Sequence, residues 1–304
     1  MFLGMDKGGK GGDDPVVCGT AFFVAWPAED ADEAAAGRGH SYLVTAKHVV
    51  DGILAKSSDQ RIYLRVNLLP TVGKGGAVWV STQRDHWRFP PEDADEYVDV
   101  AVLPYRPDAG TVDYRAVHRS MFATQQLIDS EGIGLGDDLF ITGLFVNHYG
   151  RQRNSPIVRI GNIAGMPDEP VRTNLGRMAA YLVEARSLGG LSGSPAFVSL
   201  GPLRTGSGGV QLGTSTRFFL LGLMRGHWDA DLEGAEDVAI DSHLGQELVN
   251  MGVAIVIPAE KIEAVISQRE LKEEREHAEG NWRRQTIPTE EDALSAAAEV
   301  HPEA

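Results

Sequence analysis

Short apolar runs separated by turn residues recur along this chain and constrain its fold more than any other feature. Roughly eleven such runs are rich in Val, Ile, Leu, Phe and Tyr and are bounded by Gly, Pro, Asp, Asn and Ser, which is the pattern of short β-strands. Little helix is expected among them, so the sequence predicts an all-β fold, either a sandwich or paired barrels. The runs are "VVCGTAFFVAW", "SYLVTA", "RIYLRVNLL", "AVWV", "YVDVAVLPY", "DLFITGLF", "PIVRIGNIAG", "AAYLVEA", "PAFVSL", "RFFLLGLM" and "GVAIVIP".

The two ends of the chain are expected to differ from this β-rich centre. Pro258 opens "PAEKIEAVISQ", where Ile262, Val265 and Ile266 recur at the spacing of one helix face. From residue 271 to residue 304 the sequence is charged and has few groups to pack, so a frayed helix and then a mobile tail are expected. Residues 1–13 are expected to form a flexible leader.

Composition excludes several classes of function. The 304 residues carry a formal net charge of −15, which argues against a surface for nucleic acid or anionic membranes, because both require clustered Lys and Arg. Cys18 is the single cysteine, so neither an internal disulfide nor a cysteine-based zinc site is expected. No apolar run approaches the roughly 18 residues of a membrane span. We expect a cytoplasmic protein without metal or cofactor.

A glycine-rich segment carries the strongest chemical signal. In "RSLGGLSGSPAF", residues 186–197, the glycines allow unusual backbone conformations and close approach of another molecule. A serine there would be a poor nucleophile unless a histidine took its proton and a carboxylate oriented that histidine. His48 ends the apolar run "SYLVTAKH", and Asp99 lies within "YVDVAVLPY", where an acid is costly to bury without a partner. The order His48, Asp99, Ser192 is therefore a candidate triad.

Three motifs in this order resemble the chymotrypsin-fold serine proteases. "TAKHVV" resembles the histidine segment of that family, "DVAVL" its aspartate strand and "GLSGSP" its nucleophile loop. "GTAFFV", "FLLGLMRGHW" and "GVAIVIPAEKI" are similar to further strands of bacterial trypsin-like and HtrA-like protease domains. The resemblance covers residues 14–270, and no PDZ-like segment follows it.

The resemblance implies two six-stranded antiparallel β-barrels followed by a C-terminal helix. Barrel 1 would span about residues 14–110, barrel 2 about 130–258 and the helix 258–270. Ser192 would attack the scissile carbonyl, His48 would act as base and then acid, and Asp99 would hold the imidazole tautomer. The backbone N–H groups of Gly190 and Ser192 would form the oxyanion hole.

The substrate pocket is less well marked. The resemblance implies Arg186 at its base and Arg225, Gly226 and His227 near its wall. No acid is present among these four residues, which disfavours a pocket for Lys or Arg side chains. Acidic and small apolar side chains both stay open as substrates. Leu191 occupies the position where animal members carry an aspartate, so no zymogen cleavage is expected.

Three functions are compatible with these residues. The preferred one is a serine endopeptidase acting on proteins or peptides, with a regulatory protein partner left open. The others are a catalytically silent protease fold that binds peptides or regulates, and an esterase using the same triad. Ser187 and Ser194 compete with Ser192 for the role of nucleophile, but only Ser192 lies in a Gly-x-Ser-Gly motif.

Overall fold

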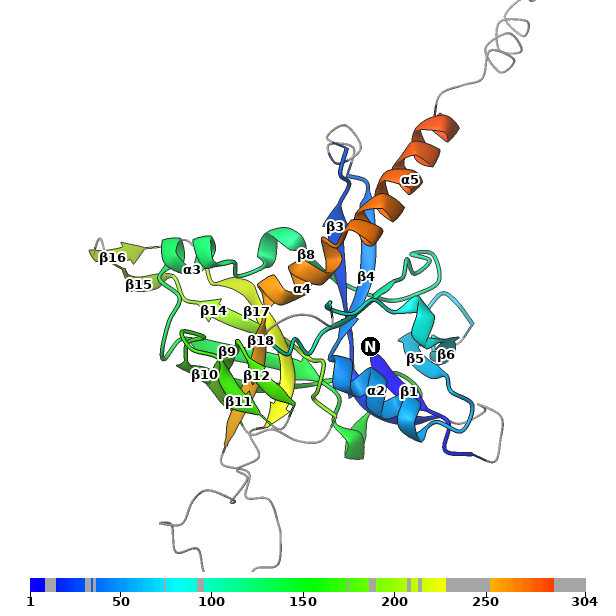
Figure 1. Cartoon of the computed structure of the whole chain (residues 1–304), viewed down its shortest axis with the longest axis horizontal. Coiled ribbons are helices and arrows are strands. Elements are labelled where there is room, and N and C mark those ends of the chain that lie inside the picture. Colours follow the sequence, from blue (N-terminus) through cyan, green and yellow to red (C-terminus); the bar gives the residue numbers. More distant parts are fainter. Residues whose placement is uncertain are drawn as a thin grey trace, which may run out of the picture.

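The molecule consists of two β-rich halves that lie side by side, with a helix running along one of them (Figure 1). This computed structural model describes residues 1–8, 15–30, 34, 37–73, 75–91, 96–173, 175–185, 190–206, 209–212, 215–227 and 252–286. Strands dominate these ranges. The expected all-β class is confirmed.

The first half contains two four-stranded sheets, in the orders β2-β1-β5-β6 and β7-β4-β3-β8. Buried side chains of both sheets, among them Leu3, Leu43 and Leu64, belong to one core. A closed barrel was expected for this half. The described strands instead form two separate sheets that share one core. The strands are β1 (Phe2–Met5), β2 (Val16–Thr20), β3 (Phe22–Pro27), β4 (Gly39–Thr45), β5 (Ile62–Asn67), β6 (Ala77–Thr82), β7 (Ala101–Pro104) and β8 (Ala116–His118).

The second half is a closed barrel in the order β10-β13-β18-β17-β14-β9. Neighbouring strands are antiparallel, and its interior is filled by fully buried residues such as Leu139, Val183 and Val256. This barrel lies within the range expected for barrel 2. Its strands are β9 (Asp138–Gly143), β10 (Ile157–Gly165), β13 (Tyr181–Glu184), β14 (Pro195–Leu200), β17 (Arg217–His227) and β18 (Val253–Pro258).

Short helices and hairpins complete the described chain. None of the helices in the described ranges is long and apolar enough to cross a membrane. The helices are α2 (Lys47–Lys56), α3 (Gln125–Glu131), α4 (Ala259–Ile266) and α5 (Arg269–Thr286), with single turns η1 (Arg84–His86), η2 (Arg119–Met121) and η3 (Val146–His148). The hairpins are β11 (Val171–Thr173) with β12 (Gly176–Met178) and β15 (Leu203–Gly206) with β16 (Gly209–Leu212).

The start of the chain is part of the fold, which corrects the expectation of a flexible leader over residues 1–13. Strand β1 pairs with β2 on one side and with β5 on the other. Phe2 and Leu3 are buried. An apolar run of only four residues before a glycine-rich segment gives no periodicity that sequence reasoning can use. Residues 9–13 of the expected leader lie outside the described residues.

Helix α5 packs against the first half, where a frayed helix and then a mobile tail were expected over residues 271–304. Arg275 is only 3% exposed; it donates to the hydroxyl of Tyr42 in β4 (2.9 Å) and to the carbonyl of Ile266 (2.8 Å). Its guanidinium also pairs with Glu29 at 2.6 Å. The residues that attach this helix to the first half are charged. Its sequence therefore has the composition of a solvent-exposed segment. A helix is thus present up to residue 286, as expected, but it is docked through buried residues and is not frayed; residues 287–304 lie outside the described part.

Glu279 is the second anchor of α5. Its carboxylate accepts the backbone N–H groups of Glu29 and Asp30, each at 2.9 Å, and lies 2.8 Å from Nε2 of His40. Burial alone would raise the pKa of Glu279, but these donors outweigh it and hold the pKa below its ordinary value. The charged form therefore stabilises the docked helix.

Replacing this carboxylate gives a pH-dependent prediction. Glu279→Gln should lower the free energy of unfolding by about 2 kcal/mol at pH 7, because it removes a buried charged acceptor. The folded pKa lies below the unfolded one, so this contribution is fully present above the ordinary value of 4.5 and is lost as the pH falls through the folded value. Chemical denaturation from neutral to acid pH measures the difference. The exposed Glu276→Gln is the control, and equal losses in both variants would contradict the prediction.

Candidate active site

Segments far apart in the sequence meet where the two halves join. The backbone N–H of Thr20, at the end of β2, donates to the carbonyl of Ser192 at 3.0 Å. Gly193 lies so close to the ends of β2 and β4 that a Cβ there would meet the carbonyl of Thr20 at 2.2 Å and Oγ1 of Thr45 at 2.3 Å. Its φ of +82° also favours glycine. The loop that carries Ser192 is thus seated against the strand that leads to His48.

His48 and Asp99 form a directly bonded pair. The backbone N–H of His48 donates to Oδ1 of Asp99 at 2.8 Å, and Nδ1 of its ring lies 2.6 Å from Oδ2. Asp99 is fully buried, whereas the His48 side chain is 32% exposed. A carboxylate only accepts, so Nδ1 carries the proton and Nε2 of the neutral ring keeps a free lone pair. A ring nitrogen with a lone pair is able to accept a proton.

The hydroxyl of Ser192 points to β17 in this structure. It donates to the carbonyl of Arg225 at 2.8 Å. Among the described residues, no hydrogen bond joins Ser192 to His48. The proton of this hydroxyl is therefore held by a backbone acceptor.

Thr20 supports the same loop from inside, a role that sequence reasoning did not assign. Its hydroxyl donates to the carbonyl of Gly190 at 2.8 Å and accepts the backbone N–H of Leu144 at 2.9 Å. Gly190 has a φ of +97°. Within the part of the chain that the structure describes, the N–H groups of Gly190 and Ser192 donate to no other group.

Of the two competing serines, Ser194 is excluded as a nucleophile in this structure. Ser194 is fully buried, and a Cβ on Gly143 would lie 1.9 Å from its hydroxyl oxygen. No substrate can reach it there. Ser187 lies outside the described residues. Leu191 is buried in the core of the second half.

Of the predicted pocket residues, Arg225 turns toward the pair formed by His48 and Asp99. Its Nε lies 4.0 Å from Oδ2 of Asp99, and its side chain is 10% exposed. Gly226 follows with a φ of +154°, and a Cβ on it would lie 3.7 Å from the hydroxyl of Ser192. Arg186 and the side chain of His227 lie outside the described part.

Charged and titratable groups surround the pair on its exposed side. The pKa of Tyr97 is raised to about 12, mainly by burial and also by the negative charges of Asp99 and Asp51. Lys47 lies 5.6 Å from the centre of the Tyr97 ring. Asp51 pairs with Lys47 at 3.1 Å and with Arg84 at 2.7 Å.

Over the described ranges, no group of three or more His, Cys, Asp and Glu side chains is placed to hold a metal ion.

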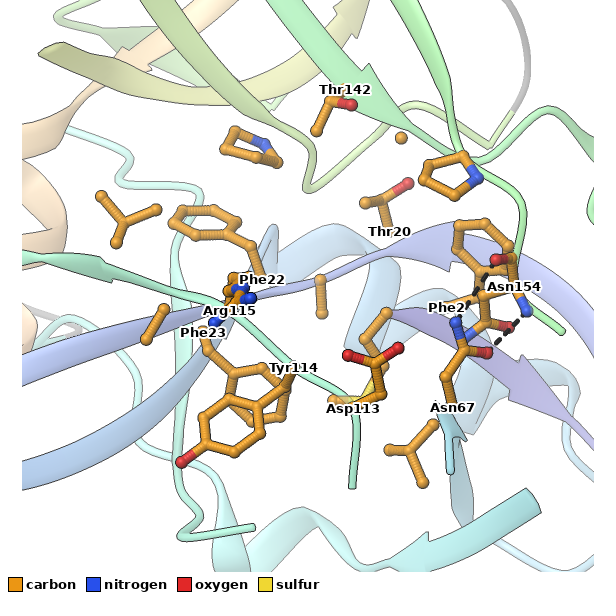
Figure 2. Close-up of a pocket in the computed structure, with 18 of the residues that line it drawn as sticks. Phe2, Thr20, Phe22, Phe23, Asn67, Asp113, Tyr114, Arg115, Thr142 and Asn154 are labelled. Carbon is orange, nitrogen blue, oxygen red and sulfur yellow. Dashed lines mark hydrogen bonds between the residues drawn. The ribbon is translucent and has the colours of Figure 1, made fainter. Parts of the chain in front are cut away.

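A cavity of about 420 Å³ lies at the seam between the halves. Figure 2 shows the aromatic side chains of Phe22, Phe23 and Tyr114 on one side of it and the bonded pair of Asn67 and Asn154 on the other. None of the triad residues lines it, but Thr20 does. The wall of this cavity therefore includes the residue that holds the carbonyl of Gly190.

Comparison with known proteins gives structural neighbours only. No known family profile matches the chain, and no curated protein matches its sequence. Among solved structures, it is similar to the MamO protease domain from Magnetospirillum magneticum (13% identity, TM-score 0.41, covering 88% of this chain and 96% of that one). It is also similar to Deg5 (16%, 0.37, 81% and 85%) and to the active form of the Rv3671c protease from M. tuberculosis (12%, 0.34, 82% and 79%). Similarities at this level of identity and TM-score assign no activity to this chain.

The support that Thr20 gives to the loop can be measured as stability. Thr20→Val keeps the shape but removes the hydroxyl, which leaves the N–H of Leu144 and the carbonyl of Gly190 without their buried partner. We expect a loss of about 1–3 kcal/mol in the free energy of unfolding. Thr20→Ser keeps the hydroxyl and should lose less. Urea denaturation that finds the valine variant as stable as the serine variant would refute this role.

Proposed function

We propose that this chain is a serine endopeptidase that hydrolyses peptide bonds through Ser192, His48 and Asp99. The observation that carries the proposal is the double hydrogen bond from His48 to the buried carboxylate of Asp99. Burying a carboxylate costs folding free energy unless its oxygens are satisfied. Here that carboxylate fixes the ring of a half-exposed histidine beside a serine loop, which is the arrangement that nucleophilic catalysis by serine requires.

The first chemical step of the proposed reaction begins with the hydroxyl of Ser192. The proposed step requires the hydroxyl of Ser192 to leave the carbonyl of Arg225 and to bond Nε2 of His48, through a change of its side-chain rotamer. His48 then takes the hydroxyl proton while the oxygen attacks the substrate carbonyl. The imidazolium that forms is stabilised by Asp99, which stays ionised.

The negative charge on the substrate oxygen is then met by backbone donors. The N–H groups of Gly190 and Ser192 supply this stabilisation, which often contributes more than any other single effect. His48 returns its proton to the leaving amine, and an acyl-enzyme on Ser192 remains. Water repeats the sequence, giving its proton to His48 and releasing the acid.

A catalytically silent, peptide-binding module is the second candidate. The observation in its favour is the hydrogen bond from Ser192 to the carbonyl of Arg225, which draws the proton away from His48. The two candidates differ in turnover. An endopeptidase cleaves peptides, whereas a silent module binds them intact.

Replacing the nucleophile tests the proposal. Ser192→Ala should reduce cleavage of a peptide library by several powers of ten, because it removes the hydroxyl that would form the acyl-enzyme. Ser194→Ala should retain the wild-type rate, since that hydroxyl is buried away from substrate. Mass spectrometry of the products measures both variants and also reports the preferred side chain at the cleavage site. Intact peptides with the wild type, or full activity in Ser192→Ala, would reject the proposal.

Replacing the carboxylate tests the role of Asp99. Asp99→Asn should lower the rate by about 10⁴, because an amide donor facing Nδ1 selects the wrong imidazole tautomer. Substrate binding should change little. The exposed Asp129→Asn is the matched control. An Asp99→Asn enzyme that keeps more than a tenth of the wild-type rate would show that Asp99 does not orient His48.

A further inference from the structure

The cavity at the seam between the two halves is much larger than the gaps that ordinary packing leaves. Its volume is about 420 Å³, whereas a water molecule takes up roughly 30 Å³ in the liquid. Close-packed interiors contain few voids larger than a water molecule, because side chains beside a void lose contacts with other atoms. Sites for small molecules typically measure roughly 300–1,000 Å³. The size of this cavity is therefore that of a ligand site.

Most of the cavity wall is apolar, and it comes from both halves of the molecule. Phe22 and Phe23 belong to β3 of the first half, and Pro195 and Phe197 belong to β14 of the second. The ring of Tyr114 packs against that of Phe23, with the ring centres 5.0 Å apart. Burial of apolar surface favours binding, so this wall suits a ligand with an apolar body.

Several polar side chains of the wall already have partners in the protein. The side-chain oxygen of Asn67 accepts the backbone N–H of Asn154 at 2.7 Å, and the amide of Asn154 donates to the carbonyl of Arg65 at 2.7 Å. The hydroxyl of Thr20 donates to the carbonyl of Gly190 at 2.8 Å. These groups are held by the fold, so the apolar surface is the main contact that the interior of the cavity offers.

The charges at the cavity leave a cation without a counterion. Among the described residues that line it, Asp113 and Arg115 carry charged side chains, and both are exposed. Asp113 pairs with Arg153 at 2.6 Å, which neutralises its charge. Within the described part of the chain, the side chain of Arg115 makes no ion pair or hydrogen bond. Figure 2 shows Arg115 beside Phe22 and Phe23, so this cation adjoins the aromatic wall where the cavity reaches the surface.

We propose that this cavity binds a small carboxylate with an apolar chain of medium length, such as octanoate. The chain lies against the aromatic side chains, and the guanidinium of Arg115 donates to the carboxylate oxygens in a charge-assisted pair. The whole protein has a formal net charge of −15, which repels anions in general, so a local cation is needed to retain one. The inference goes beyond the proposed function and does not depend on it.

Isothermal titration calorimetry of the full chain with octanoate tests the proposal. Octanoate should bind at one site per chain, and hexanoate should bind about tenfold more weakly, because it removes fewer CH₂ groups from water. 1-Octanol has the same apolar chain without the charge and should also bind more weakly than octanoate. Absence of octanoate binding, or equal affinity for octanoate and 1-octanol, would overturn the inference.

Variants of Arg115 locate the carboxylate. Arg115→Gln should weaken octanoate binding by about tenfold, because a charge-assisted hydrogen bond is lost, and should leave 1-octanol binding unchanged. Arg115→Lys keeps a cation and should lose less affinity for octanoate.

The matched control removes an arginine elsewhere on the surface. Arg172 is exposed in β11 and does not line the cavity, so Arg172→Gln should bind octanoate like the wild type. Equal losses of octanoate affinity in the two glutamine variants would contradict the proposed site. Because calorimetry needs no turnover, absence of peptide cleavage by the wild type would count against the protease alone.

Discussion

Asp99 buries a negative charge at the junction of the two halves, and a charge removed from water must be compensated within the protein. The compensation comes from α2, which supplies the backbone N–H and the ring of His48, and from β17, which brings Arg225 to 4.0 Å. Removing either partner would leave the carboxylate less well satisfied. The requirement to neutralise one carboxylate therefore ties a helix of the first half to a barrel strand of the second.

The loop that carries Ser192 depends on this junction as well. Thr20 holds it from the first half through its backbone N–H and its hydroxyl, and Met224 of β17 accepts the N–H of Gly193 at 2.7 Å. A side chain at Gly193 would collide with the ends of β2 and β4. The glycines of this loop are therefore needed for close packing between the halves as well as for access by a substrate.

Some of this arrangement could be predicted from the sequence. The alternating runs gave the barrel strands, and the order of His48, Asp99 and Ser192 predicted a site whose first two members are in fact bonded. Strand β1 was missed because four apolar residues carry no usable period. The docking of helix α5 was missed because Arg275 and Glu279 are charged residues that are buried. The side chain of Arg225 points toward Asp99 because Arg225 is the extra residue of a β-bulge in β17. The spacing of residues along a strand does not reveal a bulge.

The central claim is that Ser192 is a nucleophile activated by the pair formed by His48 and Asp99. Reaction of the full chain with a fluorophosphonate, followed by peptide mapping, tests it most directly, because such reagents are attacked by an activated serine hydroxyl and need no knowledge of the substrate. The account predicts a single adduct on Ser192, which forms in native protein and is lost after denaturation. An unmodified Ser192, or an adduct on a different serine, would contradict it.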